Sequence, residues 1–159
     1  MAVGRFLAMV GALIRREDGR YLVLQRSAQK DFGAGAWECI TGRVDQGESF
    51  SQALYREVRE ELEVDVVPEF IVGTMHFYRG EQVPEKEMLG IVYACSIKDP
   101  EAIKPGVEHA AYRWLTPAEA FDLFPSDYWL GRILRKAEAA RQLLPDGWLQ
   151  VNREYGFEI

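Results

Sequence analysis

Residues 42–64, GRVDQGESFSQALYREVREELEV, decide the fold, because they predict a glycine-containing loop that leads into an amphipathic helix. Ser49 followed by Gln52 has the form of a capping box, in which two side chains bond each other's backbone N–H groups. The helix is therefore expected to begin there and to run to about Leu62. Pro68 prevents it from continuing further.

The predicted helix combines an apolar stripe with a border of acidic residues. At about 100° per residue, the stripe consists of Leu54, Val58 and Leu62. The adjoining arc carries Glu57, Glu60 and Glu61, and the outward pole carries Gln52, Arg56, Arg59 and Glu63. Like charges one helical turn apart cost a few tenths of a kcal/mol, roughly, unless cations neutralise them. Hard carboxylate oxygens without His or Cys favour Mg²⁺ or Mn²⁺ over zinc.

The helix sequence alone also allows a second interpretation. Alternating Glu and Arg residues often form a solvent-exposed helix surface that is stabilised by salt bridges. The loop before it favours metal binding, because the fixed positions follow one long pattern. The pattern is Gly42, five residues, Glu48, seven residues, Arg56-Glu57, an aliphatic residue, any residue, and Glu60-Glu61. If composition filled each of six positions about one time in fifteen, chance would produce it less than roughly once per million windows.

This pattern resembles the Nudix, or MutT-type, box. The resemblance implies an α/β (α+β) fold, with a mixed β-sheet sandwiched between helices and the box forming loop, helix and loop. It implies that Arg56 orients the glutamates and that Glu48 supports the loop. The implied metal ligands are Gly42 (through its carbonyl), Glu57, Glu60 and Glu61. The family usually has glycine where this chain has Glu63, which predicts about 1 kcal/mol of strain at the helix end.

The resemblance also implies a reaction, attack of water on phosphorus assisted by Mg²⁺, for which Mn²⁺ could substitute. The chain is then a pyrophosphohydrolase that acts on phosphoanhydrides. Its general base is either Glu57 or Glu108, since the run EHAAYRWL, residues 108–115, resembles the family's later acid and strand. Weaker candidates are Glu85, Glu87 and Glu101. The expected catalytic residues are Arg56, Glu57, Glu60 and Glu108, and the expected substrate contacts are Arg26, Gly42 and Arg43.

The substrate is expected to be a small nucleotide or nucleotide-like polyphosphate. Short runs at residues 24–26, 37–42 and 64–67 resemble the bacterial branch that handles dihydroneopterin triphosphate and nucleoside triphosphates. ADP-ribose or another nucleoside diphosphate derivative stays equally open. Any of five aromatic residues could stack on a base, although core packing explains most aromatics: Trp37, Phe77, Tyr78, Tyr128 and Trp129. His76 and His109 are interpreted as structural.

A rival hypothesis is a Nudix-fold sensor that holds a nucleotide without cutting it. Such modules usually lose glutamates from the box, whereas this chain keeps all of them, which favours hydrolysis.

Composition sets further bounds on the chain of 159 residues. A net charge of −6 argues against a duplex nucleic-acid binder. The apolar run Phe6 to Ile14 is too short to span a bilayer, so no membrane partner is expected. Cys39 and Cys95 have no paired spacing and are expected to be buried thiols of a cytoplasmic protein. The apolar tail from Trp148 to Ile159 is a candidate homodimer contact.

The order of elements predicts one domain, residues 1–159. Expected strands are Phe6–Arg15, Tyr21–Gln25, Trp37–Ile40, Phe70–Tyr78, Met88–Ile97 and Tyr112–Leu115. Thr116 is expected to cap a helix that has Pro117 at its first position, and a last helix is expected at about 126–144. The structure of the tail beyond Trp148 is left open.

Overall fold

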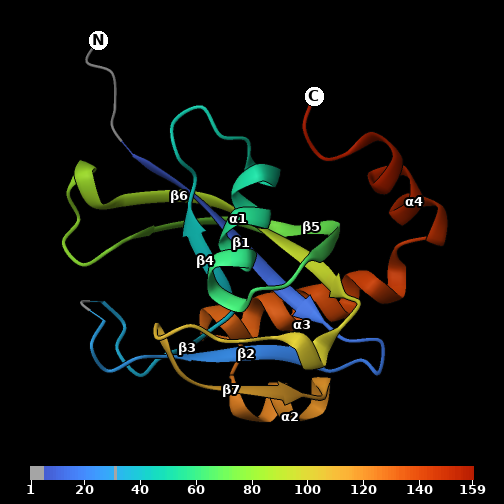
Figure 1. The fold of residues 1–159 in the computed structure, drawn as a ribbon, viewed down its shortest axis with the longest axis horizontal. Coiled ribbons are helices and arrows are strands. Elements are labelled where there is room, and N and C mark those ends of the chain that lie inside the picture. The colour runs from blue at the N-terminus through green and yellow to red at the C-terminus, as the bar shows by residue number, and fades with distance from the viewer. Residues whose placement is uncertain (1–5, 31) are drawn as a thin grey trace.

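A mixed β-sheet forms the centre of the molecule (Figure 1). The computed structural model describes residues 6–30 and 32–159, and in this part the sheet has seven strands. They are β1 (Leu7–Arg15), β2 (Tyr21–Arg26), β3 (Trp37–Glu38), β4 (Ile40–Arg43), β5 (Val66–Tyr78), β6 (Glu87–Ile97) and β7 (His109–Leu115). The order is β3-β2-β1-β6-β5, with β4 on β1 and β7 on β2. Only β1 and β6 run parallel among these pairs, so the expected mixed sheet is confirmed.

Two of the helices begin at the caps that the sequence predicts. The helices are α1 (Phe50–Leu62), α2 (Pro117–Leu123), α3 (Trp129–Leu143) and α4 (Asp146–Tyr155), with short 3-10 turns η1 (Pro84–Lys86) and η2 (Pro100–Ala102). Ser49 and Gln52 form the expected capping box before α1, and Thr116 caps α2. Helix α3 begins at Trp129, slightly later than the expected start near residue 126, and much of the tail that was left open forms α4.

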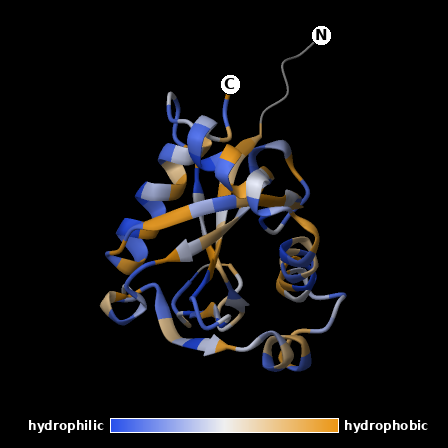
Figure 2. Ribbon diagram, turned by 90° about the vertical axis from the view of Figure 1, so that its right-hand side faces the viewer, coloured by the Kyte–Doolittle hydropathy of each residue, from blue (hydrophilic) through white to orange (hydrophobic). Residues whose placement is uncertain are grey.

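Two hydrophobic cores place the helices on opposite faces of the sheet. One core packs the apolar stripe of α1, including Leu54, Val58 and Leu62, against β1, β4 and β6. The other packs α2 and α3 against the opposite face, through residues such as Leu130 and Leu134. Figure 2 shows the hydrophobic residues concentrated on the strands between the helices. The expected sandwich is therefore confirmed, and Cys39 and Cys95 are buried as predicted.

The segment expected as one strand, Trp37–Ile40, instead forms two. Trp37 and Glu38 pair with β2, whereas Ile40 and the residues after it pair with β1. The chain changes partner at Cys39, which local propensity cannot predict because it depends on distant strands. A second difference is that β5 includes Pro68, where a register shift in the pairing with β6 accommodates a residue that has no N–H to donate.

The C-terminal tail returns to the start of α1. Phe157 packs edge-on against Tyr93, with ring centroids 5.2 Å apart. The Glu158 carboxylate accepts hydrogen bonds from the backbone N–H groups of Phe50 and Ser51, at 2.5 and 3.4 Å. A carboxylate at a helix N-terminus is favourable, so the tail adds a second cap to α1. None of the helices formed by residues 6–30 and 32–159 has the length and apolar character needed for a bilayer span.

Candidate functional site

The Glu57 carboxylate rests directly against the backbone of β4 at Gly42. A Cβ atom added at Gly42 would lie 1.8 Å from Cδ of Glu57 and 2.2 Å from each carboxylate oxygen. Only glycine, which has no Cβ atom, leaves room for the carboxylate here. The close contact between β4 and α1 therefore depends on glycine at position 42. The Glu57 side chain is 14% exposed, and its burial raises the pKa of the carboxyl despite the nearby Arg56 guanidinium.

Arg56 is the centre of the hydrogen-bond network around this point. Its guanidinium donates five hydrogen bonds, two to Glu48 and one each to Glu57, Glu60 and the carbonyl oxygen of Arg43. The bonds to Glu48 are both 2.8 Å long, and this pairing lowers the pKa of Glu48 to about 2. One planar group therefore ties the loop to two glutamates of α1.

A buried histidine holds the third glutamate. His109 Nε2 lies 2.6 Å from Oε2 of Glu61, and the two side chains are 2% and 11% exposed. Burial raises the pKa of Glu61, against the opposing effect of His109. On its other side, His109 Nδ1 lies 4.0 Å from Oε1 of Glu38, which in turn accepts hydrogen bonds of 3.0 and 2.7 Å from Arg26 Nη1. A polar chain thus links α1 through β7 to β3 and β2.

The three glutamates of α1 are bound by two different partners. Arg56 binds Glu57 and Glu60, whereas His109 binds Glu61. Within residues 6–30 and 32–159, no three acidic, imidazole or thiol side chains converge into a ready-made metal shell. The Glu60 side chain is 59% exposed and is held only by a 3.3 Å bond, so a rotamer change could turn it towards a cation.

A cleft of about 610 Å³ opens beside this network. Gly42 and Glu61 line it on the side of α1, and Arg43, Glu108 and Lys30 also line it. The Lys30 ammonium pairs with the Glu108 carboxylate and lowers its pKa. A volume of this size falls within the range of roughly 300–1,000 Å³ that is typical of small-molecule sites.

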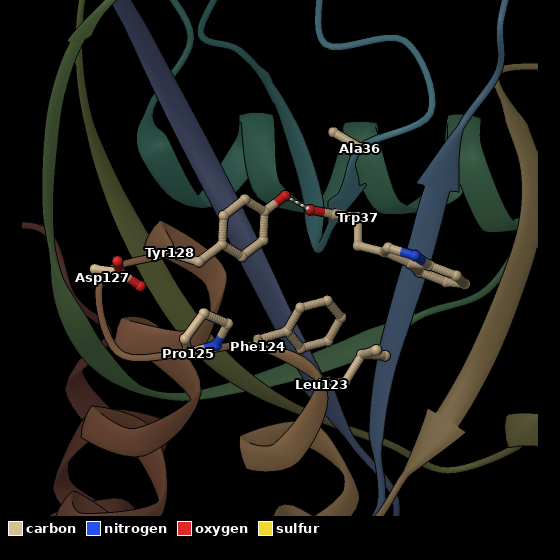
Figure 3. A pocket seen from close by; sticks show the side chains of 7 residues that line it. All are labelled: Ala36, Trp37, Leu123, Phe124, Pro125, Asp127 and Tyr128. Atoms are coloured by element: carbon tan, nitrogen blue, oxygen red, sulfur yellow. Dashed lines mark hydrogen bonds between the residues drawn. The ribbon is translucent and has the colours of Figure 1, made fainter.

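A smaller hollow of about 580 Å³ adjoins the cleft (Figure 3). It shares Ala36 and Trp37 with the cleft and is otherwise lined by the turn between α2 and α3. The Tyr128 hydroxyl donates a 2.6 Å hydrogen bond to the carbonyl oxygen of Trp37. The Phe124 and Tyr128 rings stack with centroids 5.8 Å apart, so aromatic packing fixes the start of α3.

A family model for the NUDIX domain matches residues 5–137, which is most of the chain. The chain belongs to the Nudix family. This assignment confirms the expected resemblance and the enzyme class, a hydrolase of phosphoanhydrides. Members of the family generally use divalent metal cations.

Two curated relatives and one solved structure illustrate the similarity. The CTP pyrophosphohydrolase of Escherichia coli (strain K12) is 34% identical over 140 residues, which cover 86% of this chain and 97% of the relative. The dihydroneopterin triphosphate diphosphatase of the same strain is 31% identical over 127 residues, covering 73% and 82%. The crystal structure of the MutT protein from Methanosarcina mazei Go1 aligns with a TM-score of 0.71 and 27% identity, covering 89% of this chain and 99% of that one.

The structure places the expected Nudix site residues in three groups. Gly42, Arg56, Glu57 and Glu60 meet at the contact between β4 and α1. Arg43, Glu61 and Glu108 line the cleft with Gly42. Arg26 also lines the cleft, but its Nη1 is engaged by Glu38 and its Nε donates to the carbonyl oxygen of Phe32.

Sequence reasoning interpreted His109 as structural and did not consider three further residues at the candidate site. His109 and Glu38 are buried in the chain that reaches Glu61, and Lys30 and Arg132 line the cleft. The position of His109 next to the proposed base Glu108 was the one available signal, because a residue adjacent in sequence to a site residue has its backbone close to the site. Within the part of the chain that the structure describes, neither Arg43 nor Arg132 has an ion-pair partner.

Proposed function

We propose that this Nudix protein hydrolyses a phosphoanhydride bond of a nucleoside triphosphate-like substrate, with Mg²⁺ as a cofactor that Mn²⁺ can replace. The observation that carries the proposal is the desolvated Glu57 carboxylate packed on Gly42 beside a cleft of nucleotide size. Two relatives, a CTP pyrophosphohydrolase and a dihydroneopterin triphosphate diphosphatase, support a triphosphate over a diphosphate-linked substrate.

The side chains at this point fit a hard divalent cation. Glu57, Glu60 and Glu61 offer carboxylate oxygens, and the Gly42 carbonyl offers a fourth oxygen donor. Burial raises the pKa of both Glu57 and Glu61, so a nearby cation would stabilise their ionised forms. When bound, Mg²⁺ supplies charge stabilisation at the phosphate oxygens and lowers the pKa of a coordinated water.

Three arginines position other side chains or are available to bind the substrate. Arg56 positions Glu57 and Glu60 through the network described above. Arg43 lines the cleft without an ion-pair partner in the described residues, so its guanidinium is available to a phosphate. Arg26 is assigned to holding Glu38 instead of contacting substrate.

Glu57 is proposed as the general base. Glu57 lies among the proposed cation ligands, whereas the Glu108 carboxylate is paired with the Lys30 ammonium, which lowers its pKa and makes it a weaker proton acceptor. Replacing the true base by Gln is expected to lower kcat by about 10²–10⁴-fold. Glu57→Gln should show this loss and Glu108→Gln a smaller one. The reverse order would assign the base to Glu108.

The experiment that tests the proposed function is a substrate screen. Phosphate and pyrophosphate release is measured from nucleoside triphosphates, nucleoside diphosphate derivatives and dihydroneopterin triphosphate, with Mg²⁺ and with EDTA. Magnesium-dependent release from a triphosphate is the expected result. Binding without turnover on the whole panel would instead support a nucleotide sensor.

A further inference from the structure

The cleft has two chemically different ends. Gly42 and Glu61 belong to the side of α1, whereas Trp129, Arg132 and Ile133 belong to α3. Helices α1 and α3 cover opposite faces of the sheet (Figure 1). The residues that line the cleft come from both sides, so the cleft runs from Glu61 of the acidic network to Trp129 at the start of α3. The polyphosphate end is already assigned by the proposed function, which leaves the α3 end without a role.

Trp129 is the most exposed tryptophan in this cleft. Trp129 is 36% exposed and is the first residue of α3. The other tryptophan of the cleft, Trp37, has its ring covered by Arg113, whose Cζ lies 5.2 Å from the ring centroid. The hydrogen bond from Tyr128 to the Trp37 carbonyl and the stacking of Phe124 on Tyr128 fix the turn just before Trp129 (Figure 3). An aromatic ring that is held in place and left open to a cleft suits a flat ligand.

We infer that Trp129 stacks on the heterocycle of the substrate and determines that the enzyme selects nucleotides over base-free polyphosphates. This inference rests on the proposed function, because the polyphosphate must occupy the α1 end for the heterocycle to reach α3. Stacking tolerates different rings, so one tryptophan accommodates both pyrimidines and larger fused heterocycles.

The test separates contact from affinity by using two substitutions. Tryptophan fluorescence of the full chain is titrated in the presence of Mg²⁺ with CTP, with GTP and with inorganic tripolyphosphate. Each fluorescence reading is taken before hydrolysis of the ligand begins. Trp129→Phe keeps an aromatic ring and should lose most of the nucleotide-induced quenching while retaining affinity. Trp129→Leu should weaken nucleotide binding about tenfold to hundredfold, and tripolyphosphate binding much less.

Trp148→Phe is the matched control, because Trp148 is 51% exposed on α4 and does not line the cleft. It should keep both the quenching and the affinity. The inference is overturned if Trp129→Phe quenches like the unmodified chain, or if Trp129→Leu weakens tripolyphosphate as much as CTP. Nucleotides that quench through Trp129 without being hydrolysed would refute the proposed function and leave the stacking role intact.

Discussion

Gly42→Ala is the substitution whose effect follows most directly from the geometry. The new methyl group would lie 1.8 Å from Cδ of Glu57, and real Cβ atoms do not approach other heavy atoms within 3.0 Å. The carboxylate must therefore move by roughly 1 Å or more, which also breaks the 2.7 Å hydrogen bond from Arg56. A misplacement of about 1 Å can lower the rate about a hundredfold. Because the displaced atoms are the end of a flexible side chain, the free energy of unfolding is expected to fall by no more than about 1 kcal/mol, the lower end of the range for overpacking.

The assay is kcat/KM for triphosphate hydrolysis at saturating Mg²⁺, together with thermal unfolding. Each kcal/mol corresponds to about 2–4 °C for a chain of this size. Gly147→Ala is the control, since its added Cβ meets nothing within 4 Å. A Gly42→Ala enzyme with unchanged rate would refute the reasoning, because the contact between β4 and Glu57 would then have no role in catalysis.

Three further substitutions test other parts of the account. Glu63→Gly should raise the free energy of unfolding by about 0.5–1 kcal/mol in urea titrations, because Glu63 has a φ of 58° that glycine adopts without strain; a lower stability would contradict this. Arg56→Lys should lower activity or metal affinity about 10–100-fold in Mg²⁺ titrations, since one ammonium cannot reproduce the guanidinium network; activity near that of the unmodified enzyme would argue against a positioning role. For Glu48, Arg56 lowers the folded-state pKa to about 2 from 4.5, so the stabilisation is present above about pH 4.5 and is lost as the pH falls towards 2. The stability difference between the unmodified chain and Glu48→Gln should therefore shrink between about pH 5 and pH 2, and a constant difference would rule out this pair as its source.

Local sequence signals predicted the elements that depend on nearby residues. The capping box at Ser49 and the apolar stripe of α1 are both encoded within a few positions, and the structure contains both. The strained helix end at Glu63 was also visible, because a non-glycine residue occupies a position that favours a left-handed turn.

Features that depend on how side chains fold back or on distant parts of the chain could not be predicted from the sequence. The helical wheel placed Arg56 on the outward pole, yet its long side chain folds back to Glu48 across the loop. The contact of His109 with Glu61 spans 48 positions and forms only because β7 pairs with β2. The exposure of Trp129 depends on how α3 packs on the sheet, which its local sequence does not specify.

The most direct test of the central claim is Mn²⁺ binding followed by electron paramagnetic resonance. The unmodified chain is compared with the double variant Glu60→Gln/Glu61→Gln, and circular dichroism checks that both are folded. If the carboxylates of α1 hold the catalytic cation, the unmodified chain binds Mn²⁺ and the double variant loses most of that binding. Equal Mn²⁺ binding by the two folded proteins would contradict the account.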